Sequence, residues 1–138
     1  MREANRQYAY FSLHGSFEPD DITVRTAVEP TDQWRKGDFH PVRRFERKAS
    51  HWALQSRLPE TEPIEQHIAD VLEQLDRNPD AFAEVSLQHG GCMQLVGYFH
   101  NGYPGLHFDR SICEGLAKYH LSVDFDLYDL WSDAREDT

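Results

Sequence analysis

Hydrophobic and polar residues alternate one for one in several stretches of this chain, which is the pattern of a strand with one buried face. The first stretch, residues 8–14, puts Phe11 and Leu13 on one face. Tyr8 and Tyr10 lie on the opposite face. The same alternation predicts three longer strands and one shorter strand, at residues 50–58, 92–100 and 123–128 and within 31–48.

A spacing of three to four residues predicts helices elsewhere. The clearest helix spans residues 63–78, where apolar side chains step by four, four and three, at Ile64, Ile68, Leu72 and Leu75. A short helix begins at Pro19 and ends before Pro30, and its β-branched residues make it weak on its own, so packing must hold it. Residues 81–87 form either a further helical turn or a bridge. Asp109 caps a last helix, whose inward-facing residues are expected to be Ile112, Cys113, Leu116 and Tyr119.

The order of these elements favours an α+β two-layer sandwich. We expect a mostly antiparallel sheet of five to six strands, with two to three helices on one face. Residues 106–108 are a candidate hairpin partner of the 92–100 strand across the turn residues NGYPG. A strand followed by a helix occurs at residues 8–28 and again at residues 95–121, and a ferredoxin-like arrangement would explain this repeat.

The length of 138 residues suits a single domain. We expect an ordered core over about residues 8–130, followed by an acidic tail at 131–138. The formal net charge of -10 argues against nucleic acid and anionic membranes as partners. Because no apolar stretch has the length of a signal peptide or a membrane helix, we expect a cytoplasmic protein. Cys92 and Cys113 are too far apart for a zinc motif, and we expect neither a disulfide between them nor a metal.

Several short motifs occur in a suggestive order: EPDDIT and VEPTDQWRKGD, then SHWALQS, then IEQHIADVLEQL, then GLHF and GLAKYHLSVDFDLY. Together they resemble a bacterial family called domain of unknown function 4279, over about residues 8–130. The resemblance implies a small standalone bacterial domain, and it brings no catalytic residues. Arg25 and Thr26 stand where the family pattern has two apolar residues, which bears on how deeply the first helix is buried.

Two carboxylates, Asp124 and Asp126, share one face of the last predicted strand, with their α-carbons roughly 6.5 to 7 Å apart. They could hold a divalent cation or act as an acid and base pair. They could equally face solvent or a partner while Val123, Phe125 and Leu127 fill the core. In a third interpretation, a basic stretch lies opposite and neutralises the pair, and its residues are Arg35, Lys36, Arg43, Arg44, Arg47 and Lys48.

Other catalytic chemistry finds little support in the sequence. No serine lies in a Gly-x-Ser-x-Gly elbow, and the glycine-rich stretch GGCMQLVG lacks the lysine of a phosphate loop. In a hairpin through residues 101 and 102, the imidazoles of His100 and His107 would be roughly 13 Å apart, too far to share one metal ion. We therefore predict no cofactor.

The aromatic residues favour a binding surface. Eight Phe, six Tyr and three Trp are many for a domain of this size, and a sheet covered on one face exposes part of them on the other. The leading hypothesis is a non-enzymatic protein-binding module of immunity or adaptor type, which binds through Tyr8, Tyr10, Tyr98, Asp124, Asp126 and Tyr128. The alternative is a small-molecule or metal-dependent enzyme that uses Asp124 and Asp126. A homodimer could also cover the same face.

Overall fold

The computed structural model describes residues 3–131, which form five strands and four helices. Apart from Trp131, the expected acidic tail lies outside the described residues. The strands and helices follow one another in the order β1 (Arg6–Gly15), α1 (Pro19–Thr26), β2 (Asp32–Trp34), β3 (Ser50–Gln55), α2 (Ile64–Leu75), α3 (Pro79–His89), β4 (Cys92–Phe99), α4 (Arg110–Lys118) and β5 (Ser122–Asp129).

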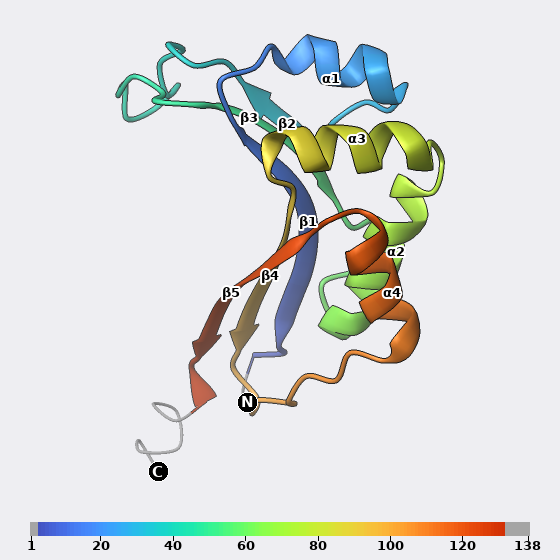
Figure 1. Cartoon of the computed structure of the whole chain (residues 1–138). Coiled ribbons are helices and arrows are strands. Elements are labelled where there is room, and N and C mark those ends of the chain that lie inside the picture. Colours follow the sequence, from blue (N-terminus) through green and yellow to red (C-terminus); the bar gives the residue numbers. More distant parts are fainter. Residues whose placement is uncertain (1–2, 132–138) are drawn as a thin grey trace.

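The molecule has two layers, as the sequence predicts. The four helices cover the same face of a single sheet, and none of the described residues forms a helix on the other face (Figure 1). The strand order is β2-β3-β1-β4-β5. Strand β1 lies at the centre and pairs antiparallel with both β3 and β4, whereas β5 pairs parallel with β4. The predicted α+β sandwich is confirmed, with a mixed sheet.

The first four strands have a ferredoxin-like arrangement. Strands β1 and β2 are joined through α1 but are separated in the sheet by β3, and α2 with α3 then leads to β4 on the other side of β1. Helix α4 and strand β5 extend this unit by one parallel strand. The structural halves are therefore β1–α1–β2 and β3–α2–α3–β4. The strand–helix repeat between residues 8–28 and 95–121 therefore does not coincide with these two halves.

The core lies between the helices and β1. The side chains of Ala9, Phe11 and Leu13 are fully buried on the helix-facing side of β1. Phe11 packs edge-to-face against Trp52 of β3 and Phe82 of α3, with ring centroids 6.1 and 5.7 Å apart. The predicted stripe of α2 is buried beneath that helix. Burying each large side chain contributes about 1.5 to 3 kcal/mol to folding.

Two local expectations are wrong, and a third element is longer than expected. Residues 106–108 form no strand, because β4 is followed by a crossover to a parallel partner rather than by a hairpin. For residues 81–87 the helical alternative is confirmed, within the longer helix α3, whose first position is Pro79. Cys113 is exposed, because α4 buries only Ile112 and Leu116 along its short length, with Tyr119 just beyond its end.

Polar groups in α1 are satisfied where the family pattern has apolar ones. Thr26 is fully buried, and its hydroxyl donates to the carbonyl oxygen of Ile22 at 2.8 Å. Arg25 reaches across to α3 and pairs with Glu84 at 2.8 Å. Helix α1 therefore packs deeply despite these residues. None of the helices within the described residues is long and apolar enough to cross a membrane.

Candidate functional site

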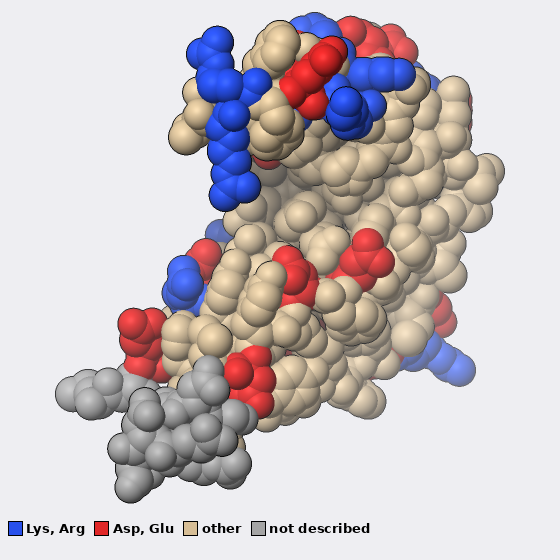
Figure 2. All heavy atoms as spheres, turned by 90° about the vertical axis from the view of Figure 1, so that its left-hand side faces the viewer, with Lys and Arg blue, Asp and Glu red and all other residues tan. Residues whose placement is uncertain are grey.

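The face of the sheet that carries no helix is a concave surface. The connection between β2 and β3 projects over it at the upper left of Figure 1. Figure 2 views this face directly and shows a hollow beneath the projecting segment. Lys and Arg side chains gather at the top of that view, with Asp and Glu side chains among them, and further Asp and Glu side chains lie scattered on the surface below. Backbone hydrogen bonds fix the projecting segment, since Gly37 donates to Arg47 and His40 donates to Phe45.

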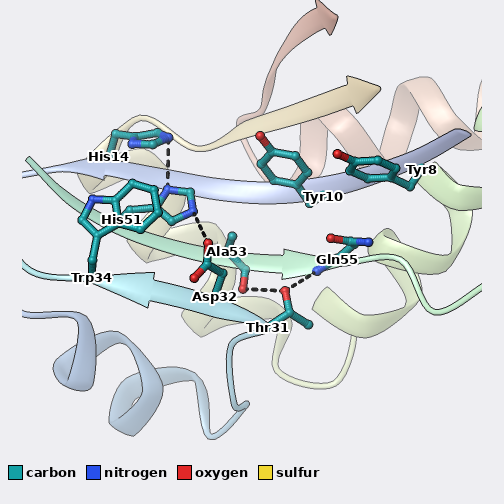
Figure 3. Close-up of a pocket in the computed structure, with 9 residues that line it drawn as sticks. All are labelled: Tyr8, Tyr10, His14, Thr31, Asp32, Trp34, His51, Ala53 and Gln55. Carbon is teal, nitrogen blue, oxygen red and sulfur yellow. Dashed lines mark hydrogen bonds and ion pairs between the residues drawn. The ribbon is translucent and has the colours of Figure 1, made fainter. Parts of the chain in front are cut away.

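A cavity of about 310 Å³ opens on this face (Figure 3). Its walls come from β1, β2 and β3, and its lining residues are Tyr8, Tyr10, His14, Thr31, Asp32, Trp34, His51, Ala53 and Gln55. A neighbouring hollow of about 390 Å³ shares His14 and Trp34 and extends under the projecting segment to Phe45 and Arg47. The two hollows together form the concave part of the open face.

Strand register brings two histidines and a tryptophan together in this cavity. His14 lies opposite His51 in the β1–β3 pair, and Trp34 lies opposite His51 in the β2–β3 pair. His14 Nε2 is 3.2 Å from His51 Nδ1, and the Asp32 carboxylate is 3.9 Å from His51 Nε2. The Trp34 ring stacks on His51 with centroids 4.1 Å apart. The Arg47 guanidinium lies 3.7 Å from the centre of the Trp34 ring.

Both imidazoles are neutral near pH 7. Burial lowers the pKa of His14 and, aided by the proximity of His14, lowers the pKa of His51 to about 4. His14 Nε2 and His51 Nδ1 share one hydrogen bond, in which the tautomers of the two neutral rings decide which nitrogen donates.

Tyrosines continue the surface along β1. The rings of Tyr8 and Tyr10 stack at 6.3 Å, and both are half-buried. Burial raises the pKa of both phenols, and the Asp126 carboxylate contributes to each increase. They are therefore neutral at physiological pH. They offer a hydroxyl and a partly exposed aromatic face to a ligand.

The β4–β5 side of the face carries a second aromatic pair and the two predicted carboxylates. Tyr98 and Tyr128 stack with centroids 5.2 Å apart and rings nearly parallel. Asp124 and Asp126 are exposed on the same face, paired in register with Gln94 and Val96 of β4. A hydrogen bond with Asp126 raises the pKa of Tyr128. All six predicted partner-binding residues thus lie on one face of the sheet, and their role in binding stays a prediction.

The proposed neutralisation of these carboxylates by the basic stretch is wrong. The stretch joins β2 to β3 at one edge of the sheet, whereas the carboxylates lie on β5 at the other edge. Four strand spacings separate the two edges, or roughly 19 Å. Arg35 pairs instead with Glu18 at 2.6 Å and Asp20 at 2.6 Å. Arg47 stacks on Trp34.

Phe125 also departs from expectation. Val123 and Leu127 pack partly buried against the core, but 58% of Phe125 is exposed. Phe125 lies on the helix-facing side of β5. Because β5 is the edge strand, the helix layer does not extend over it (Figure 1). The alternation correctly assigned the two faces, whereas the burial of Phe125 depends on where the strand lies in the sheet.

A metal centre and a Ser–His pair are two further arrangements that could carry chemistry. Among residues 3–131, no group of three or more His, Cys, Asp or Glu side chains is arranged to hold a metal ion. Ser56 and His67 form a close pair that the sequence did not indicate, with the hydroxyl 2.6 Å from His67 Nδ1. His67 is fully buried, and Ser56 also accepts the N–H of Ala9, so this pair ties α2 to the sheet rather than meeting a substrate.

The residues around His51 were missed because their proximity depends on strand pairing. The sequence placed His14 on the same face as Tyr8 and Tyr10, and His51 on one face of a second strand. Nothing in the sequence fixed which residues of β1, β2 and β3 lie opposite one another. The alternation alone could have suggested only that these side chains shared an open face.

Comparisons with known proteins agree with the resemblance seen in the sequence. No curated protein and no solved structure shows a significant match to the chain. A family model described as "Domain of unknown function (DUF4279)" matches residues 5–130, which include every strand and helix described above. The chain therefore belongs to the DUF4279 family.

Proposed function

We propose that this domain binds a cationic segment of another protein on the open face of its sheet. The observation that supports this most is the interleaving of exposed carboxylates and aromatic rings on a face without helices. Carboxylates attract Lys and Arg side chains, and aromatic rings bind the same cations through their faces. An immunity-type or adaptor role is the biological form that we propose for this binding.

The carboxylates on this face are available to a partner. Asp124 and Asp126 form hydrogen bonds with Cys92 and Tyr128, respectively, but no ion pair with another described residue, and Asp32 lies beside the neutral His51. The rings already bind cations from the chain itself. The Arg6 guanidinium lies 4.8 Å from the centre of the Tyr98 ring, and Arg47 covers Trp34. This face therefore favours guanidinium and ammonium groups.

Other ligand classes fit the face less well. The net charge of -10 and the three exposed carboxylates oppose the phosphates of nucleic acids. An enzyme built on Asp124 and Asp126 would need these groups to converge in a pocket. Neither carboxylate lines the cavity around His51, which lies toward the opposite edge of the sheet. A protein partner remains the best-supported ligand.

The test uses a hexa-arginine peptide as the probe, with binding measured by calorimetry at low and at physiological salt. The double variant Asp124→Asn and Asp126→Asn should weaken binding by roughly ten-fold. The matched control is Glu73→Gln with Glu114→Gln, which changes the net charge equally but on exposed helical positions away from the face. Equal weakening in the control, or no binding by the parent, would contradict the proposal.

A further inference from the structure

We propose that the bound segment joins the sheet as an additional strand along the outer edge of β5, with basic and apolar residues in alternation. This inference rests on the proposed function, because it names the conformation and the side-chain pattern of the cationic partner. It concerns the edge of the sheet, whereas the proposed function concerns the charge and aromatic character of its open face.

Strand β5 has the geometry of a docking edge. It pairs with β4 without interruption through eight positions, from Cys92 and Ser122 to Phe99 and Asp129. It contains no proline and no bulge. Among the described residues, no strand pairs with its other side. Such an edge presents unpaired backbone donors and acceptors that an extended peptide can bind. The opposite edge strand, β2, has only three residues.

The side chains of β5 define which strand would fit. On the open face it presents Asp124 and Asp126, both exposed. On the helix side it presents Phe125, which is 58% exposed although its neighbours Val123 and Leu127 are packed against the core. An added strand places its own side chains about 4.5 to 5.5 Å from those directly opposite. Lys or Arg would then face the two carboxylates, and an apolar residue would cover Phe125.

The same charges disfavour a second copy of this chain at the edge. Two β5 strands paired edge to edge would place Asp124 and Asp126 of one copy on the same face as those of the other. Like charges directly opposite one another in a sheet destabilise the pairing. A basic strand turns this repulsion into attraction. The acidic pair therefore selects for a cationic partner while discouraging self-association.

The experiment compares two seven-residue peptides of identical composition, one with lysine and valine alternating and one with the lysines and valines in separate blocks. Affinity is measured by calorimetry, and amide exchange in β5 is followed by NMR. We expect the alternating peptide to bind at least about ten-fold more tightly and to slow exchange in β5. Methylation of alternate backbone nitrogens in that peptide should abolish the preference, because it removes the donors that pair with the edge.

Single-residue variants distinguish binding along the edge of β5 from binding on the open face of the sheet. Phe125→Ala should weaken binding of the alternating peptide by roughly five-fold or more and leave hexa-arginine binding unchanged. Leu87→Ala is the matched control, since Leu87 is also a large apolar residue exposed to solvent but lies on α3. Equal affinity of the two lysine–valine peptides, or unaltered amide exchange in β5, would overturn the proposal that the partner adds a strand at the edge. If hexa-arginine still bound, the proposed function would nevertheless stand. Failure of every cationic peptide to bind would overturn both.

Discussion

His51 is a residue whose ionisation the fold controls closely. Only 5% of it is exposed, and burial together with the neighbouring His14 lowers its pKa from 6.5 to about 4. The folded protein therefore binds this proton less readily than the unfolded chain does. Stability linked to His51 is complete above about pH 6.5 and is lost as the pH falls toward 4. Burial lowers the pKa of His14, His67 and His89 in the same direction.

This linkage predicts a loss of stability in mild acid. Between about pH 7.5 and about pH 5, the free energy of unfolding should fall by on the order of 1 to 2 kcal/mol through His51 alone. The measurement is guanidinium unfolding across this range. His51→Phe keeps a ring against Trp34 but cannot take up the proton, so its stability should depend less on pH. His107→Gln, at an exposed position, is the control. A parent and a His51→Phe variant with the same pH dependence would refute the assignment.

The stability of the fold depends little on the Asp124 and Asp126 carboxylates. Both are exposed and have no ion-pair partner among the described residues. The double change to asparagine should therefore leave the fold intact and alter the free energy of unfolding by about 1 kcal/mol or less. Circular dichroism and denaturant unfolding provide the measurement. Loss of the fold would show that these carboxylates stabilise the protein instead of facing a partner.

Between elements, the contact of α2 with α4 depends on a glycine. Leu72 of α2 is 8% exposed and packs over Gly115 of α4, where an added Cβ would lie 2.6 Å from Leu72 Cδ1. Tyr119 and Lys118, at the end of α4, bond to Asp76 just beyond α2. The two helices are therefore fixed together at one end, so a side chain at position 115 would have to displace that of Leu72.

A double-mutant cycle tests this contact. Leu72→Ala should destabilise the protein by about 2 to 5 kcal/mol, because it opens a cavity. Gly115→Ala should destabilise the parent, since the crowding outweighs a gain in helix propensity of about 1 kcal/mol. In the Leu72→Ala background the same change should stabilise, because its methyl group enters the vacated space. We expect a coupling of on the order of 1 to 3 kcal/mol by denaturant unfolding. Additive effects would place the helices farther apart.

Elements with a strong periodic signal were predictable, and features that depend on topology were not. The stripe from Ile64 to Leu75 identified α2 and its buried face because helix periodicity is local. Alternation assigned the faces of β5 but not its position at the edge, so it placed Phe125 in the core. The cavity around His51 requires the register between three strands, which arises from long-range pairing. The crossover through α4 was missed for the same reason.

Across the whole molecule, charge and exposed edge are distributed unevenly. The basic stretch projects at the β2–β3 edge, where Arg35 pairs with acids of the chain and Arg47 stacks on Trp34. Asp124 and Asp126 lie at the opposite edge, on a strand that pairs with only one neighbour among the described residues. The central strand β1 is paired on both sides and supplies the fully buried core. The molecule thus combines a well-packed centre with an acidic, incompletely covered edge.

This arrangement predicts a gradient of local stability, which hydrogen exchange can measure. Opening β1 breaks two strand pairs and exposes the core, so its amides should exchange only through global unfolding. Opening β5 breaks one pair and exposes few buried side chains, since its residues are mostly exposed. We therefore expect β5 amides bonded to β4 to exchange faster than those between β1 and β4 by at least about ten-fold. The β1–β3 pair is an internal comparison that should behave like β1–β4. Equal exchange rates in β5 and β1 would contradict this gradient, because they would mean that β5 does not open more easily than the central strand. The weaker protection that we expect for β5 leaves room for an added strand to slow its amide exchange further.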